Sequence, residues 1–416
     1  MPIKRFPTDV TAGQIRSLSF EPPTEVVTQI IETVRSRGDA AVAELEQRFG
    51  GTNDPRRIPS EDILLARDSI DADLRAAIEL AIENVRHVSE RQMAVQGDLT
   101  GGPIVVRQGQ SIEYRYVPVE RAGAYVPGGL GSYPSTAIMC LTAARVAGVQ
   151  SIAVTSPVRE DGNVDPAVLT VCSLLDVDEI YPIGGAQAIA ALALGTGAID
   201  AVDVIVGPGN PFVQEAKRQM VGHVAIDGVA GPSELVVVAD GSADANAISL
   251  DLLAQAEHGP DSLVVLISPD PDLLDAVADL CGDIAAEMAI VLASDMDSAV
   301  ALADAIAPEH LQIVADPQVS ERLSEQVRNA GCLFVGENAA TAFGDYVVGS
   351  NHVLPTGGAA RFTSGLSPAT FTRRMAVVSI PDEAVDQLSE AGAMIARAEG
   401  FPMHAESMEA RRKPKT

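Results

Sequence analysis

The chain has 416 residues, of which 57 are acidic and 29 are basic, so its formal net charge is −28. This excess of negative charge disfavours binding to nucleic acid or to anionic membranes. Hydrophobic residues make up 47% of the chain, and a chain of this length is expected to form two or three lobes. The sequence has no apolar run of the roughly 18 to 20 residues that a membrane span requires. The N-terminal stretch MPIKRFPTDV lacks the apolar core of a secretory signal, so we expect a cytoplasmic protein.

The cysteines and lysines add two expectations. The four cysteines are far apart, without CxxC spacing, which indicates buried thiols and argues against disulfides or a cysteine zinc site. Only four of the 29 basic residues are lysines. Such an acidic, lysine-poor surface suits a high-salt cytoplasm, where salt screens self-repulsion, or it reflects an acidic amino-acid composition alone. Both explanations stay open.

The first part of the chain, residues 22–95, has the periodicity of helices. Pro22 and Pro23 precede an amphipathic run, Thr24–Phe49, and a second run covers Ser60–Met93.

From Ser151 onwards, short apolar runs alternate with helical stretches. The expected strands are Ile152–Ser156, Glu179–Ile183, Val202–Val206, Leu235–Ala239, Leu263–Ser268, Ile290–Ala293, Leu311–Val314 and Leu333–Val335. The expected helices between them include Asp165–Leu175, Pro211–Met220, Asp244–Glu257 and Pro271–Met288. This alternation predicts an α/β fold with parallel strands, in one large sheet or two smaller ones. Gly228–Gly231 is a plausible crossing between lobes, and the tail from Asp382 to Arg412 is expected to be helical again.

Two histidine motifs stand next to acidic or amide side chains. Gln255 and His258 are three residues apart at the end of a helix, so both can converge on one point. The alternative is a histidine that is placed there by the helix dipole. Glu309 and His310 adjoin at the entry to a strand, where they offer two acid/base groups or form a surface pair.

Two further histidines lie in the C-terminal part of the chain. The loop from Gly344 to Gly358 contains Asp345 and His352 and is rich in glycine, and Glu399-Gly-Phe-Pro-Met-His404 lies in the tail. Histidine, aspartate and glutamine without a thiolate suit zinc with an exchangeable position.

Four glycine-rich segments flank the expected strands: Tyr125–Gly129, Gly184–Gln187, Gly207–Asn210 and Gly231–Glu234. Each could present backbone N–H groups to a phosphate or could be a tight turn. None has the G-x-G-x-x-G spacing, so the pattern alone does not establish dinucleotide binding.

These segments, in this order, resemble the histidinol dehydrogenase family over roughly residues 20 to 412. The densest stretches are GGAQAIAALA, GPGN, EAKRQ, AGPSE, AQAEHGPDS, APEHL and GDYVVGSNHVLPTGGAARFTSGLS. The resemblance implies four zinc ligands: Gln255, His258, Asp345 and His404. It implies an acid/base pair, Glu309 and His310, and three NAD contacts: Tyr125, Gln187 and Asn210. The implied substrate contacts are Ser135, Ser233, His352 and Glu399, together with His310 and the four zinc ligands.

The resemblance also implies an architecture. We expect two incomplete Rossmann-like parallel-sheet lobes, a helical N-terminal region and a helical C-terminal tail that is exchanged in a dimer. The implied boundaries are an arm at 1–21, a catalytic lobe at 22–122 and 237–368, an NAD-binding lobe at 124–236 and a dimerisation tail at 369–416.

The implied chemistry is a four-electron oxidation of a primary alcohol by two NAD molecules in turn. L-Histidinol would pass through histidinal to L-histidine in histidine biosynthesis, with one zinc ion per subunit and active sites shared within a homodimer. One alternative is a relative that oxidises another small polar alcohol or diol with NAD. An alternative of another class is a non-catalytic regulatory binding protein on the same fold.

The sequence departs from the family pattern in two places. Thr341 stands where these enzymes usually carry a glutamate, four residues before the aspartate of GDY. The segment between the expected helix end near Met288 and the strand at Ile290 is also shorter. We expect weaker binding of the histidinol ammonium group from the first departure, because a charge-assisted contact is missing.

Overall fold

The computed structural model describes residues 3–16, 22–52, 55–98, 102–128, 131–283 and 286–412. The chain divides into two compact units. The larger unit consists of Met1–Glu90 and Val119–Phe371, and the smaller consists of Arg91–Pro118 and Thr372–Thr416. Among the described residues, none of the helices has the length and hydropathy of a membrane span. The cytoplasmic location stays a prediction.

The N-terminal helices are shorter than the sequence pattern suggested. Each expected run divides in two, giving α2 (Thr24–Arg37), α3 (Asp39–Arg48), α4 (Ser60–Ser69) and α5 (Ala72–Asp98). Gly38 separates the first pair with a φ of 54°, a conformation that favours glycine and stops a helix. Asp71 separates the second pair, because its carboxylate accepts the Asp73 and Leu74 N–H groups at the start of α5.

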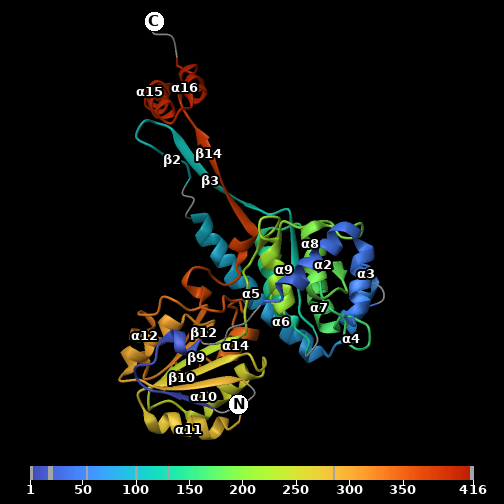
Figure 1. The fold of residues 1–416 in the computed structure, drawn as a ribbon, viewed down its shortest axis with the longest axis vertical. Helices are drawn as coiled ribbons and strands as arrows, with labels where there is room; N and C mark the ends of the chain where they lie inside the picture. Colours follow the sequence, from blue (N-terminus) through green and yellow to red (C-terminus); the bar gives the residue numbers. More distant parts are fainter. Residues whose placement is uncertain are drawn as a thin grey trace. The chain divides into compact units, whose positions relative to one another are not determined.

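The larger unit contains two parallel sheets. The first has five strands in the order β6-β5-β4-β7-β8. Its strands are β4 (Arg121–Tyr125), β5 (Ser151–Thr155), β6 (Glu179–Tyr181), β7 (Val204–Val206) and β8 (Ala225–Ile226). The helices α6 (Pro134–Ala147) and α7 (Pro166–Leu174) pack on one face, with residues of α4 and α5. The helices α8 (Gly185–Leu194) and α9 (Pro211–Met220) cover the other face, with residues of α2 and α3. Figure 1 shows this arrangement in blue and green.

The second parallel sheet of the larger unit has six strands, in the order β1-β11-β10-β9-β12-β13. Its strands are β1 (Lys4–Phe6), β9 (Glu234–Ala239), β10 (Leu263–Ser268), β11 (Glu287–Leu292), β12 (His310–Val314) and β13 (Cys332–Val335). One face packs on α10 (Ala245–Ala256) and α11 (Pro271–Cys281), and the other on α1 (Ala12–Ile15), α12 (Met296–Ile306) and α13 (Pro317–Ser324). Of the two arrangements that the sequence left open, two separate sheets is therefore the correct one.

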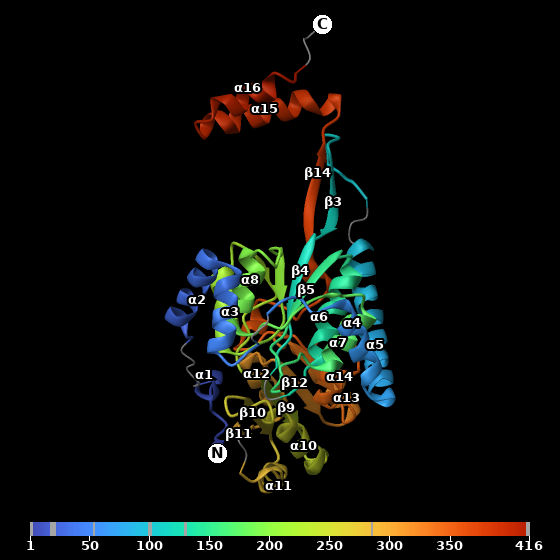
Figure 2. The ribbon, with the colours of Figure 1, turned by 90° about the vertical axis from the view of Figure 1, so that its right-hand side faces the viewer.

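The smaller unit combines a three-stranded antiparallel sheet with two helices. The sheet has the order β14-β3-β2, formed by β14 (Thr372–Ser379), β3 (Ser111–Pro118) and β2 (Ile104–Val105). The helices α15 (Asp382–Ala398) and α16 (Pro402–Glu409) lie side by side (Figure 2). Their buried cluster contains only Ala393, Ala396 and Ala405 among the described residues. The helical tail expected from Asp382 is confirmed, but a strand precedes it.

Two expectations about segments next to the six-stranded sheet were wrong. The helix expected over Pro271–Met288 ends at Cys281, because Gly282 takes a φ of 55° as its C-cap. Met288 is buried in β11, so the shortened segment is a connection between Gly282 and Glu287, part of which lies outside the described residues. Asp345, expected in a loop, lies in the short helix α14 (Thr341–Tyr346), which is followed by the 3-10 turns Ala359–Arg361 and Pro368–Phe371.

Candidate active site

The Glu309–His310 pair lies at the amino end of β12, and both side chains are buried. Glu309 accepts a hydrogen bond from the Glu234 backbone N–H at 2.9 Å. The two nitrogens of the His310 ring face different carboxylates. Nδ1 is 3.1 Å from the Glu234 backbone oxygen and 3.6 Å from a Glu309 oxygen, and Nε2 is 3.5 Å from an Asp345 oxygen. The structure therefore brings Glu309, His310 and Asp345 together, although 35 residues separate His310 from Asp345 in the sequence.

Burial and charge act in opposite directions on this group. Burial raises the pKa of Glu309, and the His310 ring and the Glu234 N–H offset only part of this effect. Burial acts to lower the pKa of His310, but the Glu309 and Asp345 carboxylates outweigh it and raise the pKa. Glu309 and His310 therefore share protons more readily than isolated side chains would, which suits acid/base chemistry.

Asp345 lies next to the histidines His310 and His352. Burial acts to raise its pKa, but the hydrogen bond from His310 and the charges of His310, His352 and His258 lower it overall. His352 points Nδ1 at the Asp345 backbone oxygen at 2.7 Å, and its Nε2 is 3.4 Å from the Thr136 hydroxyl. His310 therefore faces the Asp345 carboxylate, and His352 contacts its backbone.

Gln255 and His258 lie at the C-terminal end of α10, as expected. The Gln255 side chain is buried with its amide nitrogen unpartnered, whereas His258, just beyond the helix, is exposed. A buried amide without a partner costs free energy, which an additional group at this position would recover. Within the described residues, no three His, Cys, Asp or Glu side chains are close enough to form a metal cluster. The expected set contains three such side chains, His258, Asp345 and His404, of which His404 belongs to the smaller unit.

The expected acid/base pair, Glu309 and His310, occupies the amino edge of the six-stranded sheet. His310 is the first residue of β12, and it pairs in register with Leu235 of β9 and with Cys332 of β13. The expectation that they lie where α/β sheets place ligands was wrong in this respect, since the usual place is the carboxyl edge.

The three expected NAD contacts lie instead at the carboxyl edge of the five-stranded sheet. Tyr125 ends β4, and its hydroxyl accepts the Gly185 N–H at 3.2 Å at the start of α8. Asn210 caps α9 by accepting two backbone N–H groups. Gly209 lies against the Tyr125 ring, because a Cβ there would come within 3.2 Å of it. The loop after β7 and the end of β4 therefore adjoin.

The third contact, Gln187, shows a partner that the sequence did not reveal. Its amide donates to the buried Glu46 carboxylate at 2.7 Å, and the Gly184 N–H donates to the same oxygen at 3.1 Å. Burial raises the pKa of Glu46, although these two hydrogen bonds act to lower it. Glu46 was missed because, in the sequence, it is one of several glutamates on an amphipathic helix.

The remaining expected residues fall in different places. Ser135 lies in the first turn of α6, next to Thr136, and the Ser233 hydroxyl hydrogen-bonds to Glu309. Glu399 and His404 belong to the smaller unit, where both are exposed and His404 packs against Phe401 with ring centroids 5.4 Å apart.

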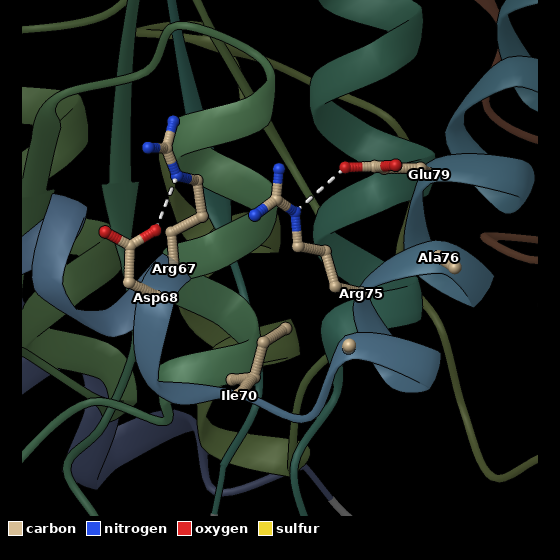
Figure 3. Close-up of a pocket in the computed structure, with 7 residues that line it drawn as sticks. Arg67, Asp68, Ile70, Arg75, Ala76 and Glu79 are labelled. Carbon is tan, nitrogen blue, oxygen red and sulfur yellow. Dashed lines mark hydrogen bonds and ion pairs between the residues drawn. The ribbon is translucent and has the colours of Figure 1, made fainter.

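A separate surface hollow lies between α4 and α5 (Figure 3). Its volume is about 390 Å³, and none of the expected site residues lines it. Its two arginines are already paired, Arg67 with Asp68 at 3.4 Å and Arg75 with Glu79 at 3.0 Å. This hollow is not the candidate active site.

Comparison with known proteins identifies the family. The family model "Histidinol dehydrogenase" matches residues 15–412. The chain belongs to the histidinol dehydrogenase family. It is 43% identical to histidinol dehydrogenase of Chlorobium luteolum, over 96% of this chain and 92% of that protein. The identity to the Thermus thermophilus histidinol dehydrogenase is 41%, over 95% and 97%. The crystal structure of histidinol dehydrogenase from Elizabethkingia anophelis matches with a TM-score of 0.90 at 27% identity, over 98% of both chains.

Membership of the histidinol dehydrogenase family confirms the resemblance and the α/β fold with two parallel-sheet lobes. The exchange of the tail between subunits and the roles of single residues are proposals, which we develop below.

Proposed function

We propose that the chain oxidises L-histidinol through histidinal to L-histidine, with NAD as the hydride acceptor. The observation that supports this most is the contact of His310 with both Glu309 and Asp345 at one buried sheet edge. A family member of 43% identity named histidinol dehydrogenase supports the substrate.

In this proposal, the two residues of the pair act in different half-reactions. His310 takes the alcohol proton while a hydride leaves for the first NAD, which yields the aldehyde. Glu309 then removes a proton from water as it adds to the aldehyde carbon, and a second hydride leaves for the second NAD. One alcohol, one water and two NAD thus give one carboxylic acid, two NADH and two protons.

We propose that Gln255, His258, Asp345 and His404 hold one zinc ion per subunit. The position of Gln255 at the end of α10 and the electrostatic effect of His258 on Asp345 support this assignment. When bound, zinc would lower the cost of removing the alcohol proton and would offset the Asp345 charge that raises the pKa of His310. Ser135, Ser233, His352 and Glu399 are proposed to contact the substrate.

The topology of the five-stranded sheet supports the NAD proposal. Its first strand, β4, lies at the centre, with β5 and β6 on one side and β7 and β8 on the other. In such a sheet, the direction of winding changes between β4 and β7, and nucleotides bind at the carboxyl ends there. Tyr125 and Asn210 lie at those ends, with Gln187 after β6.

The smaller unit supports the proposal of a homodimer with shared active sites. Its alanine cluster is too small to stabilise two helices by itself, while Met394, Ile395, Phe401 and Met403 expose more than half of their surface. We propose that a second copy covers these side chains and receives His404 and Glu399 from the exchanged tail, 369–416. The boundaries of the arm and the two lobes remain proposals as well.

The direct test uses the purified protein with L-histidinol and NAD. We expect NADH to form at two molecules per histidinol, activity to fall on chelation and to return with Zn²⁺. His258→Asn should lose both zinc and turnover while the melting temperature changes little. Stoichiometric zinc with full turnover in this variant would exclude the assignment.

The shared site is tested by complementation. His258→Asn and His404→Asn are each expected to be inactive, but a refolded mixture should regain part of the activity, because some sites in mixed dimers draw both ligands from intact positions. A monomer by light scattering at the assay concentration, or a mixture without activity, would contradict the exchange.

A further inference from the structure

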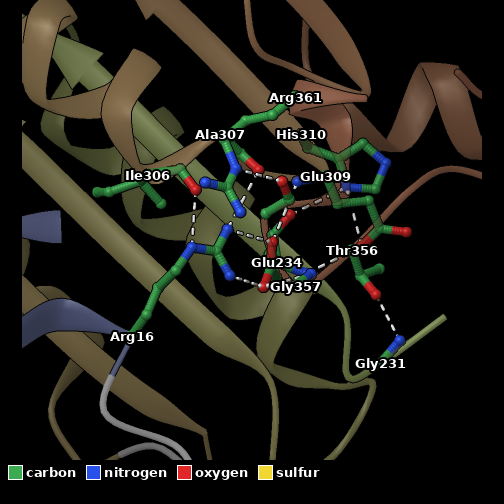
Figure 4. A network of polar contacts seen from close by, with 11 residues as sticks. Arg16, Gly231, Glu234, Ile306, Ala307, Glu309, His310, Thr356, Gly357 and Arg361 are labelled. Carbon is green, nitrogen blue, oxygen red and sulfur yellow. Dashed lines mark hydrogen bonds and ion pairs between the residues drawn. The ribbon is translucent and has the colours of Figure 1, made fainter. Parts of the chain in front are cut away.

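Arg16 connects the N-terminal arm to the catalytic edge of the six-stranded sheet (Figure 4). Its guanidinium donates to both oxygens of the Glu234 carboxylate, at 2.6 and 2.9 Å. It also donates to the backbone oxygens of Ile306 at 2.7 Å and Ala307 at 3.2 Å. Arg16 is partly buried and Glu234 is buried, so solvent screens this bidentate pair only weakly.

Glu234 and Glu309 each donate a backbone N–H hydrogen bond to the carboxylate of the other. The Glu234 N–H donates to a Glu309 carboxylate oxygen at 2.9 Å, and the Glu309 N–H donates to a Glu234 carboxylate oxygen at 3.3 Å. Gly357 donates to the second Glu234 oxygen at 3.1 Å. The Glu234 carboxylate therefore fixes the Glu309 backbone and the loop after Leu354, and its charge is compensated by Arg16.

The backbone that leads into Glu309 adopts a conformation that needs support. Ala307 has a φ of 51°, which makes it one of two non-glycine residues with positive φ in the described part of the chain. Arg16 binds the carbonyls of Ile306 and Ala307 on one side of this turn. Gly331 and Cys332 donate to the carbonyls of Pro308 and Glu309 on the other, both at 2.9 Å. The turn is thus held from two directions immediately before the catalytic pair.

We propose that Arg16 and Glu234 act as a positioning pair for Glu309, so that the N-terminal arm takes part in the aldehyde half-reaction. Neither residue touches the reacting atoms in this proposal. Arg16 holds the turn and balances the Glu234 charge, and Glu234 holds the Glu309 carboxylate and backbone in place. The inference depends on the role of Glu309 in the proposed function.

A purely structural role for Arg16 makes a different prediction. If Arg16 only anchors the arm, its loss lowers the melting temperature and reduces both half-reactions equally through the folded fraction. If it positions Glu309, its loss slows aldehyde oxidation selectively, and removing the uncompensated Glu234 charge restores part of the rate. Comparison of the single and double variants separates the two roles.

The experiment compares Arg16→Met, Glu234→Gln and the double variant in the zinc-loaded protein. Arg5→Met is the matched control. Arg5 lies in the same arm as Arg16, and its ion pair with Asp275 of α11 is exposed. The kcat and KM are measured for L-histidinol, L-histidinal and NAD, with melting temperature and zinc content. We expect Arg16→Met to lower kcat for histidinal about ten- to a hundred-fold, with the KM for NAD unchanged. The double variant should regain part of this loss, and Arg5→Met should resemble wild type.

The outcomes separate this inference from the proposed function. Glu309→Gln with normal histidinal oxidation would refute the role of Glu309, and the inference with it. If Glu309→Gln is slow but Arg16→Met oxidises histidinal normally, or loses both half-reactions equally without rescue, the positioning role is wrong. If Arg16→Met does not fold, Arg16→Lys and the double variant are used to test the positioning role. Selective loss in Arg16→Lys supports the role, and unchanged histidinal turnover in both variants refutes it.

Discussion

The two sheets of the larger unit share one topology but place their functional residues at opposite edges. In each, the first strand of the βα series lies at the centre, with two later strands on either side, and β1 adds a sixth strand to one of them. The expected NAD contacts lie at the carboxyl edge of the five-stranded sheet. Glu309, His310 and Glu234 lie at the amino edge of the six-stranded sheet.

The helix caps differ between the carboxyl edges of the two sheets. At the edge of the six-stranded sheet, four aspartates accept the first backbone N–H groups of α10, α11, α12 and α13: Asp244, Asp270, Asp295 and Asp316. In the five-stranded sheet, Asp165 caps α7 and the neutral Asn210 caps α9, whereas the N-cap residues of α6 and α8 give no side-chain bond. Because a carboxylate that caps a helix repels an anionic ligand, the carboxyl edge of the five-stranded sheet is better suited to a phosphate.

The two edges also differ in the partners of their buried carboxylates. Glu309 faces an ionisable ring, that of His310, at 3.6 Å. Glu46 faces an amide and a backbone N–H, which can hold a carboxylate in place but cannot exchange protons with it at ordinary pH. The comparison therefore predicts that variants at one edge change turnover and variants at the other change cofactor binding.

The largest effects are expected at the catalytic edge. His310→Asn should lower kcat for L-histidinol about 10²- to 10⁴-fold, because it removes the proposed base. Glu309→Gln should slow histidinal oxidation more than histidinol oxidation, and neither variant should change the KM for NAD. His87→Asn, an exposed histidine on α5, is the control. A large increase in the KM for NAD in either catalytic variant would show that the two edges are not separable.

A smaller effect is expected at Thr341, one helical turn before Asp345 on α14. The Thr341 side chain is buried and its hydroxyl has no hydrogen-bond partner. A glutamate there would supply an anion for the histidinol ammonium group, so Thr341→Glu should lower the KM for histidinol about ten- to a hundred-fold. The wild type should in turn accept an uncharged diol at comparable efficiency. Ala342→Glu, exposed on the same helix, is the control.

Steady-state kinetics with histidinol and a panel of diols measure both expectations. Strong preference of the wild type for histidinol, without any diol turnover, would show that Thr341 does not set the substrate. The presence of Thr341 in place of a glutamate would then have no effect on specificity, and the predicted difference between the two sheet edges would be unaffected.

The smallest effect is expected at Glu46. Glu46→Gln should raise the KM for NAD a few-fold and leave kcat unchanged, because Gln187 loses a charged acceptor. Burial raises the pKa of Glu46 above 4.5, so the buried charge lowers the free energy of unfolding as pH rises through the folded pKa. Denaturation at several pH values should therefore show Glu46→Gln gaining stability relative to wild type on the alkaline side. Glu44→Gln, exposed on the same helix, should show neither effect.

The sequence predicted most of the parallel strands because their apolar runs are buried on both faces, and Leu263–Ser268 matches β10 at both ends. The helix α9 (Pro211–Met220) was also predicted with its observed ends. The central strand β4 (Arg121–Tyr125) was missed, because its sequence RAGAY does not form an apolar run. The antiparallel pair of β3 and β14 was not predicted, since none of its side chains is buried and the two strands are far apart in the sequence. The three-residue strand β1 is too short to show a pattern.

The candidate site was predicted only where residues are unusual in type. Histidine is rare in this chain, and His310 and His258 were therefore recognisable. Arg16 and Glu46 are ordinary residues in arm or helix segments, and their importance depends on contacts with Glu234 and Gln187 that lie more than a hundred positions away. Such contacts leave no local pattern that a single sequence can show.

Strand β1 has a consequence for the order in which this protein folds. Residues 4–6 pair with residues 289–291 of β11, which are 285 positions away in the sequence. Contacts of such large sequence separation slow folding, and an unpaired strand is open to wrong pairing in the meantime. The five-stranded sheet, whose paired segments all lie between 121 and 226, can form first. The docking of the arm that carries Arg16 therefore depends on a contact of large sequence separation, whereas the five-stranded sheet depends on closer ones.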